Sequence, residues 1–370
     1  MESRILFVVN GLGLGNSTRC YSIIQELHAL GHSIDVATSN NGLLFYRGKP
    51  EVDNIYPIGS IHYGKGRNNR LNILRTMGLV LGGLRLFLSN ALFLTRLIRK
   101  SKPALVVYDS QYNILPRLLT RVPIVALNNS DRIVSYFFKA RNKPWSIFPQ
   151  FFMVELLDSM FHKMVPHFVM SPWLEGRQKD GKFKRVGLIV REGIEPVCRE
   201  NLSVRKILIM LSGSSFGGDI DPSSWNLPYH FDIVGREGRS SSLVRFHGKL
   251  VDNIPLLLAA DIVVINAGFS AVSEAIALKK PTVVIPVENH GEQWVNGQII
   301  RGLGMGDVAT LENVRERLMS VIDNFEKYSA NALRAQIPTN GAAECARWIR
   351  SLEFCKPLTL NSLVGQKARF

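Results

Sequence analysis

Strand-like runs and stretches of helical periodicity alternate along the chain from its first residues onward. Residues 5–9 form a continuous apolar run, which is typical of a strand buried on both faces of a sheet. A glycine loop follows at 10–15, and apolar positions then recur at helical spacing over 17–30. Gly31 suits a helix C-cap, and a second strand-like run covers 33–38. The order strand, loop, helix, strand predicts a parallel sheet.

The same alternation starts again in the second half of the chain. A polar stretch at 191–203 is interpreted as a linker, after which the strand-like run 206–211 leads into a second glycine loop. Further strands are predicted at 104–108, 123–127, 231–235, 262–265 and 282–285. We therefore predict an α/β fold of two Rossmann-like domains, residues 1–190 and 204–340, facing each other across a cleft. The helix and tail at 341–370 are expected to cross back to the first domain.

Composition narrows the class of protein. The 370 residues are 46% hydrophobic, which excludes intrinsic disorder as the main description. The cysteines at positions 20, 198, 345 and 355 include no C-x-x-C pair, so a disulfide framework and a zinc ribbon are both disfavoured. The apolar run 5–9 is too short for the core of a secretory signal. A reducing, cytoplasmic location is expected.

Positive charge is concentrated in the first half. Residues 1–190 hold 25 Lys/Arg against 11 Asp/Glu, whereas 191–370 are almost balanced. The interval 54–108 contains nine basic residues and no acidic one. Such a run indicates either a solvated face or an anionic partner. The partner could be lipid headgroups, a phosphorylated acceptor or nucleic acid.

The longest apolar tract, 73–98, bears on the membrane question. Polar residues that include Arg75, Arg85 and Arg96 interrupt it, so it lacks the roughly 20 uninterrupted apolar residues of a spanning helix. Its polar positions recur at helical spacing and form a narrow stripe. Two interpretations stay open: a helix buried against the sheet, or a helix whose face enters a bilayer surface with its cations at the headgroups. The second would place the protein peripherally on the inner face of the membrane.

The two glycine loops are candidate phosphate sites, because backbone N–H groups at a helix start can bind anions. In the first loop Gly11, Gly13 and Gly15 do not match the dinucleotide fingerprint, which disfavours a nicotinamide dehydrogenase. The second loop, Gly213-Ser214-Ser215, adds hydroxyl groups and suits a pyrophosphate better. The alternative for the first loop is a tight turn between strand and helix.

The most specific stretch lies at 266–296. A strand ends at Gly268, a helix begins near Ser270, and Glu274 follows in its first turns, where it could accept hydrogen bonds from a ribose diol. Glu292 and Gln293 follow the next strand and could bind sugar hydroxyls. As an ordered set these residues point to a nucleotide sugar.

These motifs resemble those of glycosyltransferases with two Rossmann-like domains, the GT-B fold. The chain is similar to the family of the lipid II-forming N-acetylglucosaminyltransferase of peptidoglycan synthesis, a family 28-like group. Within it, the likeness is greatest to uncharacterised bacterial and archaeal members that open with a loop of the form V-N-G-x-G-x-G-H-x-x-R. The similarity covers most of the chain and is strongest at 4–46 and 244–304.

The resemblance implies roles for individual residues. Glu274 would hold the donor ribose and the backbone of Val251 the uracil ring, while the second glycine loop and 268–270 would face the pyrophosphate. Glu292 and Gln293 would contact the donor sugar. Further donor-side candidates are Phe269, His290 and Asn296; the acceptor or phosphate loop comprises Gly11, Gly13, Gly15 and Arg19. The acceptor would lie on the basic N-terminal domain, in agreement with the charge distribution.

Two departures from the family pattern concern catalysis. Asn16 stands where relatives carry histidine, and an amide cannot act as a general base although it can orient an acceptor. Ala271 replaces a threonine that would contact the donor. Asp109, at the end of strand 104–108, is therefore the candidate base, with a helix cap as its alternative role. Weaker candidates for the base are His28, His32 and His62. No metal or other cofactor is expected.

Four functions stay open. The first is inverting transfer of a sugar from a nucleoside diphosphate, UDP above all, to an acceptor hydroxyl that is lipid-linked or membrane-associated. The second is a phage-type DNA glycosyltransferase, ranked lower because no zinc site or interleaved aromatic-basic motif accompanies the charge. The third is a UDP-sugar 2-epimerase, and the fourth is an inactive sugar-nucleotide-binding partner of another transferase.

Overall fold

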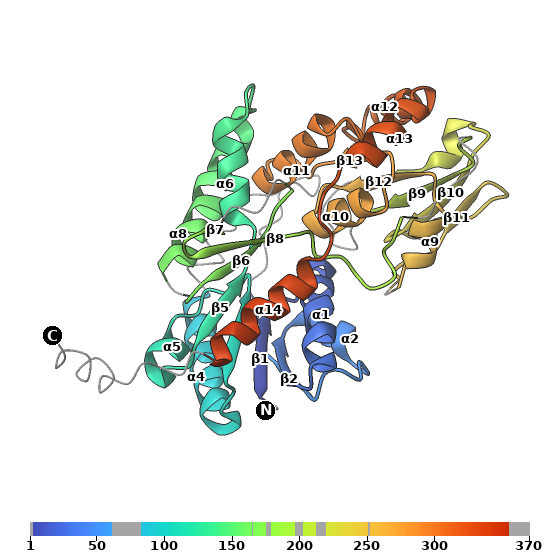
Figure 1. Cartoon of the computed structure of the whole chain (residues 1–370). Helices are drawn as coiled ribbons and strands as arrows, with labels where there is room; N and C mark the ends of the chain where they lie inside the picture. Colours follow the sequence, from blue (N-terminus) through green and yellow to red (C-terminus); the bar gives the residue numbers. More distant parts are fainter. Residues whose placement is uncertain are drawn as a thin grey trace, which may run out of the picture.

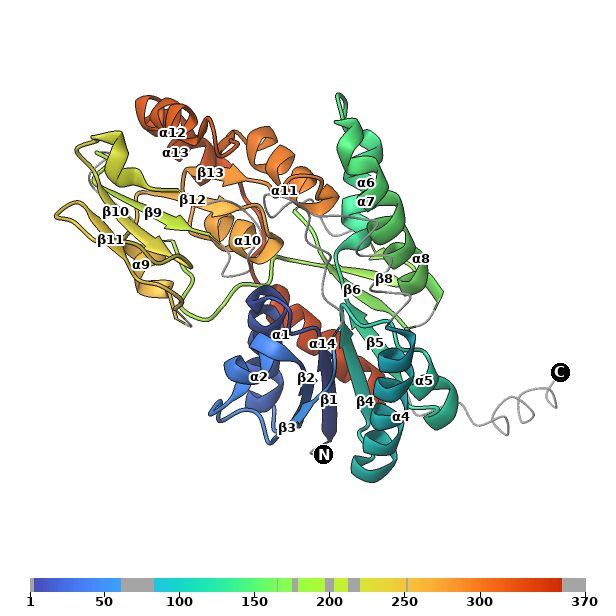
Figure 2. The same ribbon diagram turned by 180° about the vertical axis from the view of Figure 1, so that it is seen from behind.

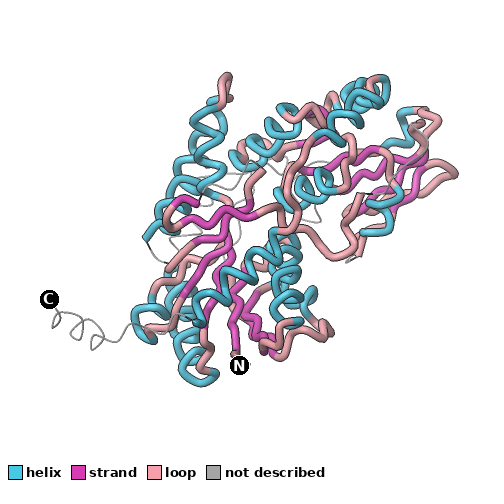
Figure 3. The backbone as a smooth tube through the Cα atoms, viewed as in Figure 1, coloured by secondary structure: helices cyan, strands magenta, loops and turns pink. Residues whose placement is uncertain are grey.

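The computed structural model describes residues 3–60, 83–164, 166–174, 179–196, 203–211, 220–250 and 252–354. Each half of the chain forms its own sheet with helices packed against it (Figure 1). In the tube view, strands and helices alternate through both halves (Figure 3). The predicted α/β class with two Rossmann-like domains is thereby confirmed.

Among the described residues, the first sheet has eight strands in the order β3-β2-β1-β4-β5-β6-β8-β7, all parallel except the two-residue β7. The strands are β1 (Arg4–Val9), β2 (Ser33–Thr38), β3 (Asn54–Pro57), β4 (Leu105–Asp109), β5 (Ile124–Leu127), β6 (Val169–Pro172), β7 (Lys179–Asp180) and β8 (Phe183–Val186). The helices of this half are α1 (Leu14–Ala29), α2 (Asn40–Tyr46), α4 (Leu84–Ser101), α5 (Leu115–Thr120), α6 (Ser130–Lys139), η2 (Trp145–Ile147), α7 (Phe148–Gln150), the π-helix η3 (Phe151–Leu156) and α8 (Leu157–Met164).

Strand β1 shows why residues 5–9 are all apolar. Ile5 and Phe7 point to one side of the sheet and join a core with Ile23 of α1, whereas Leu6 points to the other side and joins a core with Leu94 of α4. Side chains alternate between the faces of a strand, so a strand covered by helices on both sides must be apolar at every position.

The second sheet repeats the same topology. Its six described strands run in the order β11-β10-β9-β12-β13-β14, and all pairs are parallel. The strands are β9 (Lys206–Met210), β10 (His230–Val234), β11 (Val244–Phe246), β12 (Ile262–Asn266), β13 (Thr282–Ile285) and β14 (Gly306–Val308). The helices are η4 (Pro222–Trp225), α9 (Ile254–Ala259), α10 (Phe269–Ala277), α11 (Gly291–Gly302), α12 (Val314–Asp323) and α13 (Phe325–Arg334).

Helix α14 (Gly341–Phe354) returns to the first half, where it lies beside α1 in both views (Figures 1 and 2). Cys345 and Ile349 are fully buried in the core that α1 forms with the first sheet. Glu344 accepts a hydrogen bond from the backbone N–H of Gly187 at 2.8 Å, which fixes the end of β8 to the start of α14.

Two helices differ from the sequence expectation. Helix α1 begins at Leu14, earlier than predicted, because Gly13 is extended and serves as its N-cap. Gly15 and Asn16 therefore lie in the first helical turn and not in a loop. Helix α4 extends past residue 98 to Ser101, while residues 61–82, with the beginning of the predicted apolar helix, lie outside the described residues. In the described part of the chain, no helix combines the length and apolarity needed to cross a membrane.

The two halves also share a core. Ile133, Phe137 and Phe151, from α6 and η3, belong to the same buried cluster as Val295 of α11. The ring centroids of Phe137 and Trp294 of α11 lie 6.3 Å apart. Both views show α6 beside α11 (Figures 1 and 2), so the helices that follow β5 link the two domains.

Candidate functional site

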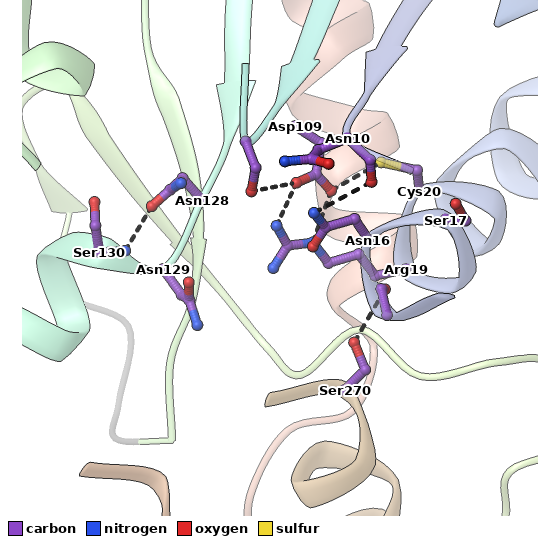
Figure 4. A network of polar contacts seen from close by, with 12 residues as sticks. Asn10, Asn16, Ser17, Arg19, Cys20, Asp109, Asn128, Asn129, Ser130 and Ser270 are labelled. Atoms are coloured by element: carbon purple, nitrogen blue, oxygen red, sulfur yellow. Dashed lines mark hydrogen bonds and ion pairs between the residues drawn. The ribbon is translucent and has the colours of Figure 1, made fainter. Parts of the chain in front are cut away.

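The carboxyl ends of the two sheets meet where each strand order reverses, between β1 and β4 and between β9 and β12. Open α/β sheets bind ligands at these positions. The starts of α1 and α10 come together there, and the Ser270 hydroxyl donates to the carbonyl of Gly15 at 3.0 Å (Figure 4). Two helix N-termini, each with partial positive charge, thus converge on one region, which favours an anionic ligand.

The glycines of the first loop differ in how closely other atoms approach them. A Cβ atom at Gly11 would lie 1.8 Å from the backbone oxygen of Ser39, so close backbone packing requires glycine at that position. A Cβ at Gly15 would lie 3.1 Å from the Ser270 hydroxyl, whereas a Cβ at Gly13 would meet no atom of the described residues within 4 Å. Gly13 is therefore the loop position whose surroundings leave room for a ligand.

Asp109, the last residue of β4, lies beside this loop and forms a buried ion pair with Arg19. One carboxylate oxygen accepts a hydrogen bond from Arg19 Nε at 2.7 Å, and the other accepts from the second guanidinium nitrogen (Figure 4). The thiol of Cys20 also donates to Asp109 at 3.0 Å, and burial raises the pKa of that thiol. Asp109 is fully buried. Arg19, the Cys20 thiol and the Ser110 hydroxyl, which donates at 3.2 Å, together engage both carboxylate oxygens of Asp109, so the geometry disfavours Asp109 as the base.

The same pair disfavours Arg19 as a phosphate ligand, because its side chain is buried and directed at Asp109. Asn16, by contrast, is partly exposed on the first turn of α1, and its amide donates weakly to the carbonyl of Asn10 at 3.4 Å. Asn16 is thus placed to orient a bound group, which is the role that its chemistry allows. His32 is buried with its ring 3.0 Å from the Ser3 hydroxyl, and His62 lies outside the described residues.

On the donor side, Glu274 forms a bidentate ion pair with an arginine from the linker. Arg191 donates to its two oxygens at 2.6 and 2.9 Å and to the side chain of Asn253 at 2.7 Å. Each carboxylate oxygen keeps a second lone pair, so the pair fixes the orientation of Glu274 without using all its accepting capacity. Gly213, Ser214, Ser215 and Val251 lie outside the described residues.

Two other donor-side candidates have their polar groups engaged within the protein. Asn296 is fully buried, accepts a hydrogen bond from Arg132 at 2.8 Å and donates to the carbonyl of Ala267 at 2.8 Å. Gln293 accepts from the backbone N–H of Val287 at 2.9 Å. These contacts give Asn296 and Gln293 positions in the framework of the site.

Arg132 is a charged residue at the domain junction that the sequence analysis did not identify. Its guanidinium is fully buried and lies 4.1 Å from the centre of the Phe269 ring, at the start of α10. Within the described part of the chain, its nitrogens Nε and Nη1 have no hydrogen-bond partner, and burial lowers its pKa to about 10. Arg132 lies in the first turn of α6, the helix that follows β5, and this position after a strand could have identified it from the sequence as a candidate site residue.

Five further residues form what we call the interdomain polar cluster: Asn129, Gln150, Glu155, His290 and Glu292. Asn129 donates to Glu292 at 3.1 Å, and Gln150 donates to Glu155 at 2.9 Å while accepting from the backbone N–H of Gly291 at 2.7 Å. Burial and the nearby Glu292 raise the pKa of Glu155 to about 8, and burial lowers the pKa of His290. Ligand atoms of Glu155, His290 and Glu292 all lie within 4.8 Å of one another, so these three could hold a metal ion.

Sequence reasoning found the C-terminal members of this cluster and missed the N-terminal ones. Glu155 is the one carboxylate in the apolar run 151–157, and this pattern indicates a buried acidic side chain with a functional role. Asn129 follows β5 at the carboxyl edge of the sheet, the position where such folds place ligand contacts. Arg191 gave no signal, since it lies in a segment interpreted as a linker.

Comparison with known proteins gives one family match over most of the chain. The family described as "Glycosyl transferase family 1" matches residues 3–209 and 238–325. An uncharacterised glycosyltransferase of Methanosarcina mazei is 23% identical over 380 aligned positions, covering 90% of this chain and 93% of that protein. A second relative comes from Geobacillus thermodenitrificans and is named UDP-N-acetylglucosamine–N-acetylmuramyl-(pentapeptide) pyrophosphoryl-undecaprenol N-acetylglucosamine transferase. It is 30% identical over 174 aligned residues, which cover 40% of this chain and 49% of that enzyme.

Solved structures agree with the fold. The glycosyltransferase SsfS6 of Streptomyces sp. SF2575 superposes with a TM-score of 0.62 at 16% identity, covering 94% of this chain and all of that one. MurG of Acinetobacter baumannii gives 0.61 at 13% identity, covering 95% of this chain and all of that one. One structure of SsfS6 was solved with thymidine diphosphate.

Proposed function

Because the chain belongs to glycosyl transferase family 1, we propose that it transfers a sugar from a UDP-sugar to a hydroxyl of a lipid-linked or membrane-associated acceptor. The family and the two-domain fold confirm the resemblance that the motifs indicate. The observation that carries the acceptor proposal is an apolar and basic outer surface on the N-terminal domain. The donor proposal is supported by the helix starts and carboxylates of the C-terminal domain.

The donor would be held by the start of α10 and by Glu274. N–H groups at Phe269 and Ser270 would bind the diphosphate, and Glu274, oriented by Arg191, would accept from the ribose hydroxyls. His290 and Glu292, at the start of α11, would face the sugar. A diphosphate complex of the neighbour SsfS6 supports a nucleotide donor of this kind.

The transfer that we propose is a direct displacement with inversion. The acceptor oxygen bonds to the anomeric carbon while the bond from that carbon to the diphosphate oxygen breaks, and the hydroxyl proton leaves to water. The helix starts would stabilise the charge that develops on the departing diphosphate. Asn16 would orient the acceptor hydroxyl, and Asp109 would act as a positioning residue that holds α1 through Arg19.

The surface that would meet the membrane lies on helices α4 and α8. Leu84, Leu88 and Leu92 recur at helical spacing along α4, and all three are about half exposed or more. Arg85, Arg96 and Lys100 are exposed on the same helix. Leu157, Met160 and Met164 form a second exposed apolar row on α8. Both helices lie on one side of the N-terminal domain (Figures 1 and 2).

This arrangement favours the bilayer interpretation of the apolar helix over the buried one. The inner face of α4 packs against the sheet through Leu94 and Ile98, yet its outer face presents leucines and cations together. Apolar side chains can enter the headgroup boundary, and each cation near an anionic surface contributes on the order of 1 kcal/mol. These two contributions support the proposed peripheral position on an anionic membrane.

Flotation with liposomes tests the acceptor side. Binding should require anionic phosphatidylglycerol in phosphatidylcholine vesicles and weaken at high salt, because surface charges are screened. Replacing Arg85, Arg96 and Lys100 by Gln should reduce it at least tenfold. Matched controls are Gln at three exposed cations of α12 and α13, namely Arg315, Lys327 and Arg334, which should bind like the unmodified protein.

A second set of variants separates apolar insertion from charge. Leu84, Leu88 and Leu92 changed together to Ser should weaken binding even at high salt, whereas Leu333→Ser on α13, also well exposed, should leave it unchanged. Absence of binding to anionic vesicles, together with tight and salt-sensitive binding to DNA or RNA, would contradict the lipid proposal and favour a nucleic-acid acceptor.

A further inference from the structure

We propose that Glu155, His290 and Glu292 form a binding site for one divalent transition-metal ion that joins the two domains. Glu155 lies on the π-helix η3 of the N-terminal domain, and the other two lie at the start of α11 in the C-terminal domain. Their ligand atoms are mutually within 4.8 Å. Short π-helical segments are frequent at functional sites, which agrees with the position of Glu155.

The donor set fits a first-row transition ion. One imidazole nitrogen with two carboxylates resembles the mixed nitrogen and oxygen ligands of zinc sites, while all-oxygen sets suit magnesium or calcium. Ligand atoms about 2.1 Å from a tetrahedral ion lie about 3.4 Å apart. Small side-chain rotations would therefore bring these three groups into coordinating positions, and a water or ligand would complete the shell.

Charge at the cluster is only partly balanced by the buried guanidinium of Arg132, which interacts electrostatically with both Glu155 and Glu292. Glu155 is 6% exposed and receives its hydrogen bond from the neutral amide of Gln150, and Glu292 receives one from the neutral amide of Asn129. In the described chain, neither carboxylate forms an ion pair with a lysine or arginine. Nδ1 of His290 is inaccessible and has no hydrogen-bond partner among the described residues. Two neighbouring carboxylates and an imidazole nitrogen without a described partner form a partly buried site that a divalent ion would satisfy.

Surrounding groups hold the ligands in place, as outer-shell partners do in metal sites. Gln150 links Glu155 to the backbone N–H of Gly291, next to His290. A Cβ at Gly291 would lie 2.6 Å from the Gln150 amide oxygen, so this contact depends on the glycine. The side chains that would bind the ion are thus fixed from both domains before it arrives.

Such an ion would connect the N-terminal domain to the C-terminal domain. It would add coordinate bonds between η3 and α11, beside the apolar contacts that Phe137 and Phe151 already make with the second domain. The metal would therefore stabilise the arrangement in which the two sheets face each other. His290 and Glu292 are also the residues proposed to face the donor sugar, so this inference rests on the proposed donor site, and Zn²⁺ retention is measured without any sugar or acceptor.

Metal analysis of the untagged full-length protein tests it. After chelator treatment, equilibration with Zn²⁺ and dialysis, the unmodified chain should retain about one ion and unfold at a higher temperature than its metal-free form. With Co²⁺ in place of Zn²⁺, visible absorption bands typical of low coordination number should appear. Glu155→Gln and His290→Gln should each weaken Zn²⁺ binding at least tenfold and remove the thermal shift.

A histidine–carboxylate pair elsewhere provides the control. His247 and Asp232 lie 2.6 Å apart without a third ligand, so His247→Gln should leave zinc binding unchanged. If Glu155→Gln fails to fold, Glu292→Gln replaces it, because Glu292 is only partly buried. Failure of the unmodified protein to retain Zn²⁺, or equal retention by the cluster variants, would overturn the proposal and indicate a proton shared between the two carboxylates.

Discussion

At the scale of single residues, the buried pair of Arg19 and Asp109 determines how the start of α1 is held. Removing one partner leaves the other charged and buried, so Asp109→Asn should lower the free energy of unfolding by about 3–5 kcal/mol. The double variant Arg19→Met/Asp109→Leu should recover much of that loss, since apolar residues can fill the same space. Urea unfolding measures both effects.

Sugar transfer by the same double variant distinguishes the two roles of Asp109. As a positioning residue it can be replaced together with its partner, so the folded double variant should retain turnover within about tenfold. A stable double variant with turnover reduced by 100-fold or more would restore Asp109 as the catalytic base.

Glu274 provides the second test at this scale. Glu274→Ala should weaken UDP binding by about 1–3 kcal/mol, because two acceptors for the ribose hydroxyls are lost. Calorimetry with UDP measures this without requiring turnover. Glu326→Ala, at an exposed acidic position of α13, is the matched control and should bind UDP normally. Unchanged UDP affinity in a folded Glu274→Ala protein would contradict the assignment.

Residue identities could be predicted from the sequence more readily than their contacts. Gly11 and Glu274 stand out because each follows a strand in a recognisable order. The pairing of Glu274 with Arg191 could not be predicted, since 83 residues separate the two and no local pattern connects them. Glu155 and Glu292 likewise meet only because η3 packs against α11. Asn296 was predicted to contact the donor, yet it is fully buried and bonds to Arg132 and to the carbonyl of Ala267.

At the scale of elements, helix α14 completes the core of a domain from the opposite end of the sequence. Ile349→Ala should lower the stability of the N-terminal domain by about 2–5 kcal/mol, because Ile349 is fully buried against α1. Hydrogen exchange at the β1 amides reports that domain directly. Leu333→Ala, on exposed α13, should change exchange there by less than about 0.5 kcal/mol. Equal exchange in both variants would contradict this role.

Strands were easier to predict than helix ends. Buried parallel strands are mostly apolar, so the apolar runs 5–9 and 283–285 can be recognised in the sequence as strands. Helix α1 starts three residues before the predicted position 17, because its first turn contains Gly15, which is typical of a loop. Its N-cap, Gly13, has no side chain that would indicate a helix start. Tertiary packing determines which face of α4 contacts the sheet. Periodicity alone could therefore not distinguish the exposed leucines of this helix from its core residues.

At the scale of the whole molecule, two sheets of the same topology contribute different chemistry. The N-terminal domain carries nearly all the excess positive charge and the exposed apolar rows of α4 and α8. The C-terminal domain contributes Glu274 and the starts of α10 and α11. This division agrees with an acceptor approaching from a membrane and a nucleotide sugar held on the opposite domain.

Sugar transfer by the purified protein tests the central claim most directly. The protein is incubated with a panel of nucleotide sugars, with and without anionic vesicles that carry lipid-phosphate-linked sugars as acceptors. We expect release of UDP from one UDP-sugar only when the acceptor vesicles are present. An equal amount of sugar should then appear in the lipid fraction with inverted anomeric configuration. Conversion of a UDP-sugar to its 2-epimer without acceptor, transfer to DNA, or binding of donors with no release of diphosphate would contradict the account.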